Sequence, residues 1–203
     1  LINAFHSNDD IHSLTARLIF EKDEINSEER RVGKTINFGV IYGMGIKKFA
    51  RSTGVSSPEA KEFLIKYKER YSKIFKYLEL QERLALSKGY VETIFGRKRE
   101  FKFDENGLGR LRGKDPYEID LKSARRAGME AQSLRAAANA PIQGSSADII
   151  KIAMVKLNKK FLELKLPAKM LLQVHDELLF EVEPDALKVT TELIKDTMEN
   201  CIQ

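Results

Sequence analysis

The chain has 203 residues and a mass of 23.2 kDa, and its 42% hydrophobic and 32% charged residues are ordinary for a folded domain, which excludes a disordered or membrane-embedded chain. No apolar run reaches the roughly 18 residues of a membrane span, and the single cysteine, Cys201, excludes an internal disulfide and is typical of a reducing compartment. Lys and Arg number 35 against 30 Asp and Glu, and the net charge of +5 favours a phosphate-bearing partner without requiring one.

The first helix signal lies near the start of the chain. Asp10 suits the N-cap of a short amphipathic helix that continues from Leu14 to Phe20, and this places His12 in the first turn. A histidine at a helix start is usually polar surface, so these residues alone leave its role open.

The segment from Ser27 to Gly45 carries the strongest signal in the chain. Ser27 suits the N-cap, and Glu28 and Glu29 follow in the first turn, where the helix dipole favours acids. The helix is expected to close near Gly43.

This helix is predicted to have two chemically different faces. At roughly 100° per residue, one face carries two cations and then two rings, namely Arg30, Lys34, Phe38 and Tyr42. The opposite face is an apolar stripe made of Val32, Ile36 and Val40. Two cations followed by rings suit a ligand with a polyanionic tail and a flat ring, such as a nucleoside triphosphate. The alternative is that the cations are only solvated and that Phe38 is core, but Gly39, which costs about 1 kcal/mol relative to Ala, favours a close approach of a ligand or backbone.

The exposed face fills the signature RxxxKxxxFxxxYG, and through it the chain resembles the family A DNA polymerases. The resemblance implies that this helix is the mobile wall of a fingers subdomain. It implies that Arg30 and Lys34 contact the triphosphate and that Phe38 packs on the sugar and base of the nucleotide. It also implies that Tyr42 lies near the templating base. A DIHxxTA segment of the family, matched from Asp10 to Ala16, implies that His12 reaches the same triphosphate.

Two helices are expected next. A short helix from Lys47 to Thr53 ends at Gly54, and Ser56 to Glu59 supply a cap, a first-turn proline and a capping box for the next helix. That helix is expected to be long, to end at Gly89 and to keep its aromatic rings in the core. Its apolar positions are Phe63, Leu64, Tyr67, Tyr71, Ile74, Tyr77 and Leu78.

A strand and a basic loop follow. Alternation from Tyr90 to Phe95 predicts a short strand that turns at Gly96, and the segment from Arg97 to Lys114 is expected to be a loop. Its cations are Arg97, Lys98, Arg99, Lys102, Arg110, Arg112 and Lys114. They are either ordinary surface or contacts to the sugar-phosphate backbone of DNA, which are independent of sequence and weakened by salt. A GYVETxFGRxR stretch that recurs in the family implies the second, with Arg97 and Arg99 on DNA.

An alanine-rich helix from Lys122 to Ala138 runs toward Pro141, where it either kinks or ends and restarts with Asn139 as a cap. Arg135, Asn139 and Gln143 stand four apart and face one way if the bend is mild. Their donors suit the minor-groove acceptors that every correct base pair presents, which would test pair shape without reading sequence. The alternative is that these side chains cap a helix or form hydrogen bonds at the edge of the core. The family's RxxxNxPxQGxxAD segment is matched here, which implies the DNA contacts.

The last third of the chain predicts a helix, a hairpin and a closing helix. The segment from Ala147 to Leu164 is amphipathic and is expected to pack on a hairpin over residues 170–183, and Leu187 to Met198 forms the closing helix. The hairpin turn carries His175, Asp176 and Glu177, which without context are solvent-facing turn residues.

The turn also matches QVHDE, the palm motif of the family. Mg²⁺ takes hard oxygen ligands, and two such ions about 4 Å apart neutralise the attacking and leaving oxygens of phosphoryl transfer. The resemblance implies that Asp176 is a Mg²⁺ ligand, that Glu177 assists it, and that His175 steadies the primer end. Arg30 and Lys34 would neutralise the departing pyrophosphate, with Lys34 as the expected proton donor.

The sequence therefore predicts an α+β fold that is an incomplete polymerase domain. Mostly helical fingers are expected over residues 1–134, with the nucleotide-binding helix at 27–43, and a partial palm over 135–203, with a small antiparallel metal-binding hairpin at 170–183. The resemblance also implies a first metal-binding aspartate upstream of Leu1, so we expect the 203 residues alone to be inactive.

The resemblance implies template-directed DNA synthesis on primer-template DNA from deoxynucleoside triphosphates, with Mg²⁺ as cofactor. It implies a monomeric replication and repair enzyme of the bacterial type, cytoplasmic, associated with the nucleoid and without membrane contact. Two alternatives are a single-subunit RNA polymerase fragment, which shares the Arg, Lys and Tyr-Gly positions, and a non-catalytic nucleic-acid-binding module. Phe38 and the later motifs favour DNA synthesis over the first alternative.

Overall fold

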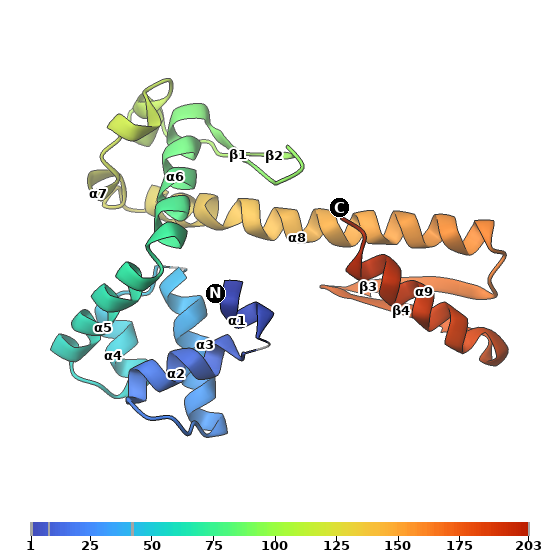
Figure 1. Cartoon of the computed structure of the whole chain (residues 1–203). Coiled ribbons are helices and arrows are strands. Elements are labelled where there is room, and N and C mark those ends of the chain that lie inside the picture. Colours follow the sequence, from blue (N-terminus) through green and yellow to red (C-terminus); the bar gives the residue numbers. More distant parts are fainter. Residues whose placement is uncertain (1, 8, 42, 203) are drawn as a thin grey trace. The chain divides into compact units, whose positions relative to one another are not determined.

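A computed structural model describes residues 2–7, 9–41 and 43–202, and it is mostly helical with two small antiparallel hairpins (Figure 1). The predicted α+β fold class is confirmed. The chain divides into two compact units, unit 1 with residues 1–88 and 102–139, and unit 2 with residues 89–101 and 140–203. Within the described ranges, no helix is both long and apolar enough to cross a membrane. The assignment of residues 1–134 to fingers and 135–203 to palm stays a prediction.

Unit 1 is built from helices. In chain order they are α1 (Ile2–His6), α2 (Ile11–Phe20), α3 (Ser27–Ile41), α4 (Ile46–Thr53), α5 (Ser57–Arg70), α6 (Ser72–Lys88), the short 3₁₀ helices η1 (Leu108–Leu111) and η2 (Pro116–Glu118), α7 (Leu121–Ala124) and the first turns of α8 (Glu130–Glu163). The predicted caps around α4 and α5 are confirmed, since Gly54 ends α4 in the left-handed region and Ser56 and Glu59 form a complete capping box.

The start of α3 corrects one prediction. The side chain of Asn26 accepts from Glu29 N at 2.9 Å, and the carboxylate of Glu29 accepts from Asn26 N at 3.0 Å. Asn26 O also accepts the first helical bond, from Arg30 N at 2.9 Å. Asn26 is therefore the N-cap and Ser27 is not, because the acid that completes a capping box must stand three residues after the cap.

The buried stripe of α3 is confirmed. Ile36 and Val40 are buried in one apolar cluster with Phe49 and Leu64, and Val32 packs against its edge. On the neighbouring side α3 lies directly against α2, because a Cβ at Gly33 would collide with the carbonyl oxygen of His12. Glycine at this position lets the two helix backbones touch, and this contact sets the place of His12 beside α3.

The long helix expected after Ser56 is two helices. Tyr71, at φ −107° and ψ 30°, separates α5 from α6, and the two helices differ in direction (Figure 1). The ring of Tyr71 packs on that of Tyr67 at 4.7 Å, and Tyr67 of α5 also contacts Phe75 of α6 edge-on at 6.3 Å across this joint. Apolar spacing continues through the break, which is why periodicity did not reveal it. Tyr77 is 40% exposed, so its placement in the core was wrong.

The first hairpin of unit 2 pairs β1 (Tyr90–Glu92) with β2 (Lys98–Glu100) in antiparallel register. The expected turn at Gly96 is confirmed by its φ of +76°. The segment expected as a loop after Arg97 is a loop only in part, because β2 and η1 lie inside it. All three residues of β2 are exposed, so the strand has no apolar alternation to predict it.

Helix α8 corrects the predicted start of this helix and excludes one of the two alternatives left open at Pro141, namely that the helix ends there and restarts. It begins at Glu130, where the carboxylate accepts from Asp104 N and Leu108 N, and not at Lys122, which lies in the separate α7. It also continues through Pro141 without ending. Proline lacks only its N–H, and its carbonyl still accepts, here from the side chain of Ser145 in the following turn at 2.6 Å.

The second hairpin of unit 2 pairs β3 (Ala168–Val174) with β4 (Glu177–Val182), and η3 (Pro184–Ala186) leads to α9 (Leu187–Glu199). The expected hairpin and closing helix are confirmed. Phe161 of α8 contacts Phe180 of β4 edge-on at 5.9 Å, so the predicted packing of this helix on the hairpin is confirmed too. The turn consists of two residues, and His175 adopts a left-handed φ of +54°.

Candidate functional site

The exposed face of α3 carries the first group of predicted site residues. Arg30 and Lys34 are exposed, and Phe38, on the face opposite the buried stripe, is 49% exposed. Tyr42, which was predicted to lie near the templating base, is outside the described residues. The three described positions therefore share one solvent-facing surface, as the helical spacing predicted.

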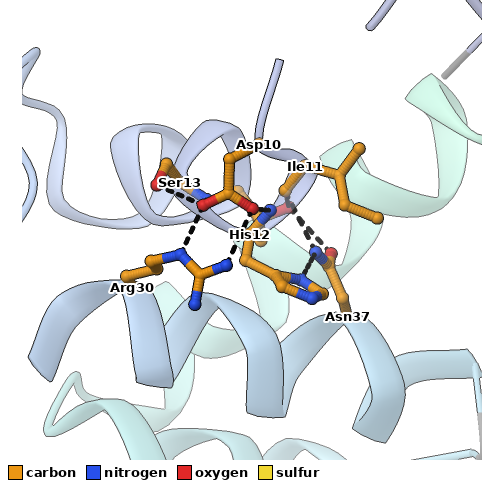
Figure 2. A network of polar contacts seen from close by, with 7 residues as sticks. Asp10, Ile11, His12, Ser13, Arg30 and Asn37 are labelled. Atoms are coloured by element: carbon orange, nitrogen blue, oxygen red, sulfur yellow. Dashed lines mark hydrogen bonds and ion pairs between the residues drawn. The ribbon is translucent and has the colours of Figure 1, made fainter. Parts of the chain in front are cut away.

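Asp10 connects this face to the start of α2 (Figure 2). Its carboxylate caps α2 by accepting from His12 N at 3.2 Å and Ser13 N at 3.3 Å, and it also accepts from Ser13 Oγ at 2.7 Å. The guanidinium of Arg30 donates to both carboxylate oxygens, at 2.5 and 3.2 Å. Burial raises the pKa of Asp10, but the hydrogen bonds from Ser13, Arg30 and His12 and the charge of Arg30 outweigh it and hold the pKa well below its usual range.

His12 lies over the same surface. Its ring centroid is 5.9 Å from that of Phe38. The pKa of His12 is lowered, chiefly by burial and also by the charges of Arg30 and Lys34, while Asp10 acts in the opposite direction. Four predicted residues thus come together from two helices. We call the set His12, Arg30, Lys34 and Phe38 the nucleotide patch.

A buried amide lies beneath the nucleotide patch. Asn37 is 8% exposed, and its side chain contacts His12, the carbonyl of Ile11, and the hydroxyls of Thr15 and Tyr67. Neither the buried contacts of Asn37 with His12 and Tyr67 nor the pairing of Asp10 with Arg30 was predicted from the sequence, where Tyr67 was expected only as a core ring. The sequence did offer one signal for Asn37. It is a polar residue beside the apolar stripe of α3, and asparagine is a poor helix former in a helix interior.

Arg135 lies at the other end of α3. It is exposed, and a Cβ built on Gly43 would be 3.2 Å from its Cδ. Asn139 of the same helix is 7% exposed and donates to Arg135 O at 3.0 Å. Asn139 therefore bonds within α8 and does not cap a helix, because α8 continues past it. A DNA contact for Asn139 stays a prediction.

Three predicted DNA contacts meet in unit 2. Arg97, Arg99 and Gln143 line a cavity of about 230 Å³ between the β1–β2 hairpin and α8. Arg97 also donates to Asp148 at 2.7 Å and to Gly144 O at 3.1 Å. Burial raises the pKa of Asp148, but the Thr93 hydroxyl and the Arg97 guanidinium outweigh burial and lower it. Arg97 is therefore anchored to α8 as well as to its own hairpin.

The turn of the second hairpin presents the predicted acids. His175, Asp176 and Glu177 are exposed, and Gln173 Nε2 donates to His175 O at 2.8 Å, which braces the turn. Two adjacent exposed carboxylates are hard oxygen donors of the kind that Mg²⁺ takes together with phosphate and water, so the donor set fits that ion. Among the described residues, no cluster of three or more His, Cys, Asp or Glu side chains is arranged to hold a metal.

The two groups differ in chemistry. The nucleotide patch offers two cations, an imidazole and an aromatic face, which suit a phosphate chain joined to a sugar and base. The β3–β4 turn offers carboxylates, which suit a cation.

Comparison with known proteins places the whole chain in one group. The sequence model described as DNA polymerase family A matches residues 1–203. The DNA polymerase I of Synechocystis sp. is 52% identical over 202 residues, which cover 100% of this chain and 20% of that protein. The DNA polymerase I of Caldicellulosiruptor bescii is 40% identical over 204 residues, covering 100% of this chain and 22% of that protein.

A solved structure is also similar. It is the POL domain of Pol1 from M. smegmatis in complex with DNA primer-template and dNTP, with a TM-score of 0.78 and 34% identity, covering 100% of this chain and 33% of that one. The chain thus spans about a fifth of the length of the curated relatives it matches.

Proposed function

We propose that this chain, which belongs to DNA polymerase family A, is the nucleotide-binding portion and part of the catalytic portion of a DNA polymerase. The protein that contains it would add deoxynucleoside triphosphates to the 3′ end of a primer, as directed by a template. The observation that carries the proposal is the nucleotide patch, in which His12, Arg30 and Lys34 lie beside the exposed ring of Phe38.

Each member of the nucleotide patch has a proposed role. Arg30 and Lys34 bind the triphosphate and neutralise the departing pyrophosphate, and Lys34 gives it a proton. Phe38 packs on the sugar and base, and His12 donates to a phosphate oxygen. Charge-assisted donors of this kind act mainly where negative charge develops in the transition state. Tyr42, at the templating base, completes the proposed set.

The carboxylates of the β3–β4 turn are proposed to hold Mg²⁺. Asp176 would be the ligand, and Glu177 would assist through water or a hydrogen bond, while His175 steadies the primer end. Bound Mg²⁺ supplies charge neutralisation at the attacking and leaving oxygens. Holding two such ions takes more oxygen ligands than this turn offers, so we expect the isolated 203 residues not to extend a primer.

The proposed DNA contacts divide into two kinds. Arg97 and Arg99 would contact the sugar-phosphate backbone, which gives affinity that is independent of sequence. Arg135, Asn139 and Gln143 would contact minor-groove acceptors. We further propose that the whole enzyme is a monomer of the bacterial cytoplasm, associated with the nucleoid, that serves replication and repair.

Single-nucleotide incorporation by the full-length enzyme tests the proposal. Lys34→Ala is expected to lower turnover by about 100- to 1000-fold while leaving primer-template affinity nearly unchanged, because the lysine acts on charge that develops during transfer. Lys47→Ala, an exposed lysine of α4 in the same unit, is the matched control and should have little effect. Equal losses of turnover and DNA affinity in Lys34→Ala would refute the role of this lysine. Incorporation of ribonucleotides in preference to deoxynucleotides would refute DNA synthesis.

A further inference from the structure

The side chain of Asn37 is bonded on every side although it is almost completely buried. Its Oδ1 accepts from Thr15 Oγ1 and from Tyr67 OH, both at 2.7 Å. Its Nδ2 lies 3.1 Å from Ile11 O and 3.1 Å from His12 Nδ1. An amide has two donor and two acceptor positions, so these four contacts use its full capacity and join α2, α3 and α5.

The carbonyl of Ile11 determines which way this amide points. A backbone carbonyl can only accept, so the amide atom facing Ile11 O must be the nitrogen. The oxygen then faces the hydroxyls of Thr15 and Tyr67, both of which are able to donate. The orientation of the Asn37 side chain therefore follows from its partners.

The same orientation determines the proton position on His12. Since Asn37 Nδ2 is a donor, His12 Nδ1 must accept from it, and the proton of the neutral imidazole must be on Nε2. Protonation of the ring would set one N–H against another at this contact. Figure 2 shows the ring of His12 directed at the amide of Asn37, between α2 and α3.

We propose that Asn37 is a positioning residue that holds the His12 ring as a neutral donor, with the proton on Nε2 available to a phosphate oxygen of the nucleotide. Tyr67 and Thr15 hold Asn37 in turn. The inference rests on the nucleotide contact proposed above for His12, and it assigns Asn37 and Tyr67 a role that acts only through that histidine.

The charges around His12 favour a neutral donor. Arg30 and Lys34 approach from α3 and disfavour a third positive charge, while Asp10, at the start of α2, favours one. Tyr67, the titratable group facing the network from α5, has its pKa raised by burial and donates as a phenol. Asn37 adds a directional contact to this balance, because it can hydrogen-bond the neutral ring in one tautomer only.

The first test is spectroscopic and does not depend on catalysis. In the full-length enzyme labelled with ¹⁵N in its histidine rings, the His12 signals are assigned by their loss in His12→Ala. The expected shifts show an unprotonated Nδ1 and a protonated Nε2, with a titration midpoint below the ordinary value. Asn37→Leu, which keeps the volume and removes the donors, should mix the tautomers and raise the midpoint. A proton on Nδ1 in the unmodified enzyme would overturn the proposal.

The second test is a double-mutant cycle on the KM for the incoming deoxynucleotide. Asn37→Leu is expected to raise KM about tenfold in the parent enzyme but less than about twofold in a His12→Ala background, because residues that act through one another are not additive. Tyr67→Phe keeps the ring and should raise KM by about threefold, again only when His12 is present. This variant provides the test if Asn37→Leu does not fold. Tyr71→Phe is the control for loss of a neighbouring hydroxyl and should leave KM unchanged.

The outcomes separate the two proposals. If His12→Ala raises KM but Asn37→Leu and Tyr67→Phe raise it equally in both backgrounds, only the positioning role is overturned. If His12→Ala leaves KM unchanged, the nucleotide contact of His12 is wrong, and the role of Asn37 in nucleotide binding is overturned with it.

Discussion

The guanidinium of Arg30 donates to both carboxylate oxygens of Asp10, at 2.5 and 3.2 Å, so the cation proposed to bind the triphosphate has an anionic partner within the chain. Asp10 is at the same time the N-cap of the helix that carries His12. A phosphate group that binds Arg30 must share or replace this carboxylate. The pair therefore links the proposed nucleotide binding to the start of α2.

Asp10→Asn tests this competition. Asparagine is as good an N-cap as aspartate, so α2 should keep its start while Arg30 loses its charged partner. We expect the KM for the deoxynucleotide to fall by about threefold with primer-template affinity unchanged, as measured by steady-state incorporation and DNA titration. Asp120→Asn is the matched control, because Asp120 caps α7 with similar bonds, to Lys122 N, Ser123 N and Ser123 Oγ. A rise in KM for Asp10→Asn would mean that Asp10 orients Arg30 and does not compete for it.

Gly33 is predicted to be essential for the packing of α2 on α3. A methyl group there would meet the carbonyl of His12 and would lie 3.0 Å from Ala16 N, and backbone atoms cannot move aside without separating the helices. We expect Gly33→Ala to lower the free energy of unfolding by about 2 to 3 kcal/mol in urea denaturation. Gly39→Ala on the same helix is the control, because its methyl would meet only the flexible end of Met44. Equal effects at the two glycines would contradict this account.

The stability of the protein should depend on pH through His12. Its pKa is lower in the folded protein than the ordinary value of 6.5, so below that value the unfolded chain binds a proton that the folded chain does not. His12 therefore contributes stability that is complete above pH 6.5 and is lost as the pH falls from 6.5 through the lowered folded pKa. This contribution is measured as the change in the free energy of unfolding, determined in urea, between pH 8 and pH 5. The part of the slope due to His12 should be missing in His12→Gln, and identical slopes in the two proteins would exclude this contribution.

Asp176 is predicted to be needed for chemistry and not for DNA binding. Asp176→Asn removes a charged ligand while keeping the shape of the turn, and we expect turnover to fall by about 1000-fold with primer-template affinity retained. Glu177→Gln should cost less, because Glu177 is proposed to act indirectly. Asp185→Asn, an exposed acid of η3 in the same unit, is the control. Full activity of Asp176→Asn across a Mg²⁺ titration would exclude the proposed ligand.

Features that depend on residues close in sequence were predicted well. The two faces of α3, the capping box at Ser56, the left-handed ends at Gly54 and Gly89, and the hairpin around Asp176 all follow from short-range hydrogen bonding and periodicity. The mistaken cap at Ser27 is of the same local kind. It arose because Asn26 and Ser27 both suit a cap, and only the reciprocal bond with Glu29 distinguishes them.

Two of the remaining features come from contacts between distant segments. The start of α8 is tied to a preceding loop through Glu130, which accepts from Asp104 N, and the middle of α8 is tied to the first hairpin through Ser145, which accepts from Ile94 N. None of these partners is near enough in sequence to leave a periodic signal.

By itself, the sequence determined which residues share the exposed face of α3, because a helix places every fourth residue on one side whatever surrounds it. Only the tertiary structure decided the partners of that face. The pairing of Arg30 with Asp10 and the contacts of Asn37 with His12 and Tyr67 join separate helices. Such contacts depend on how closely the helix backbones approach, which side-chain volumes and Gly33 set together.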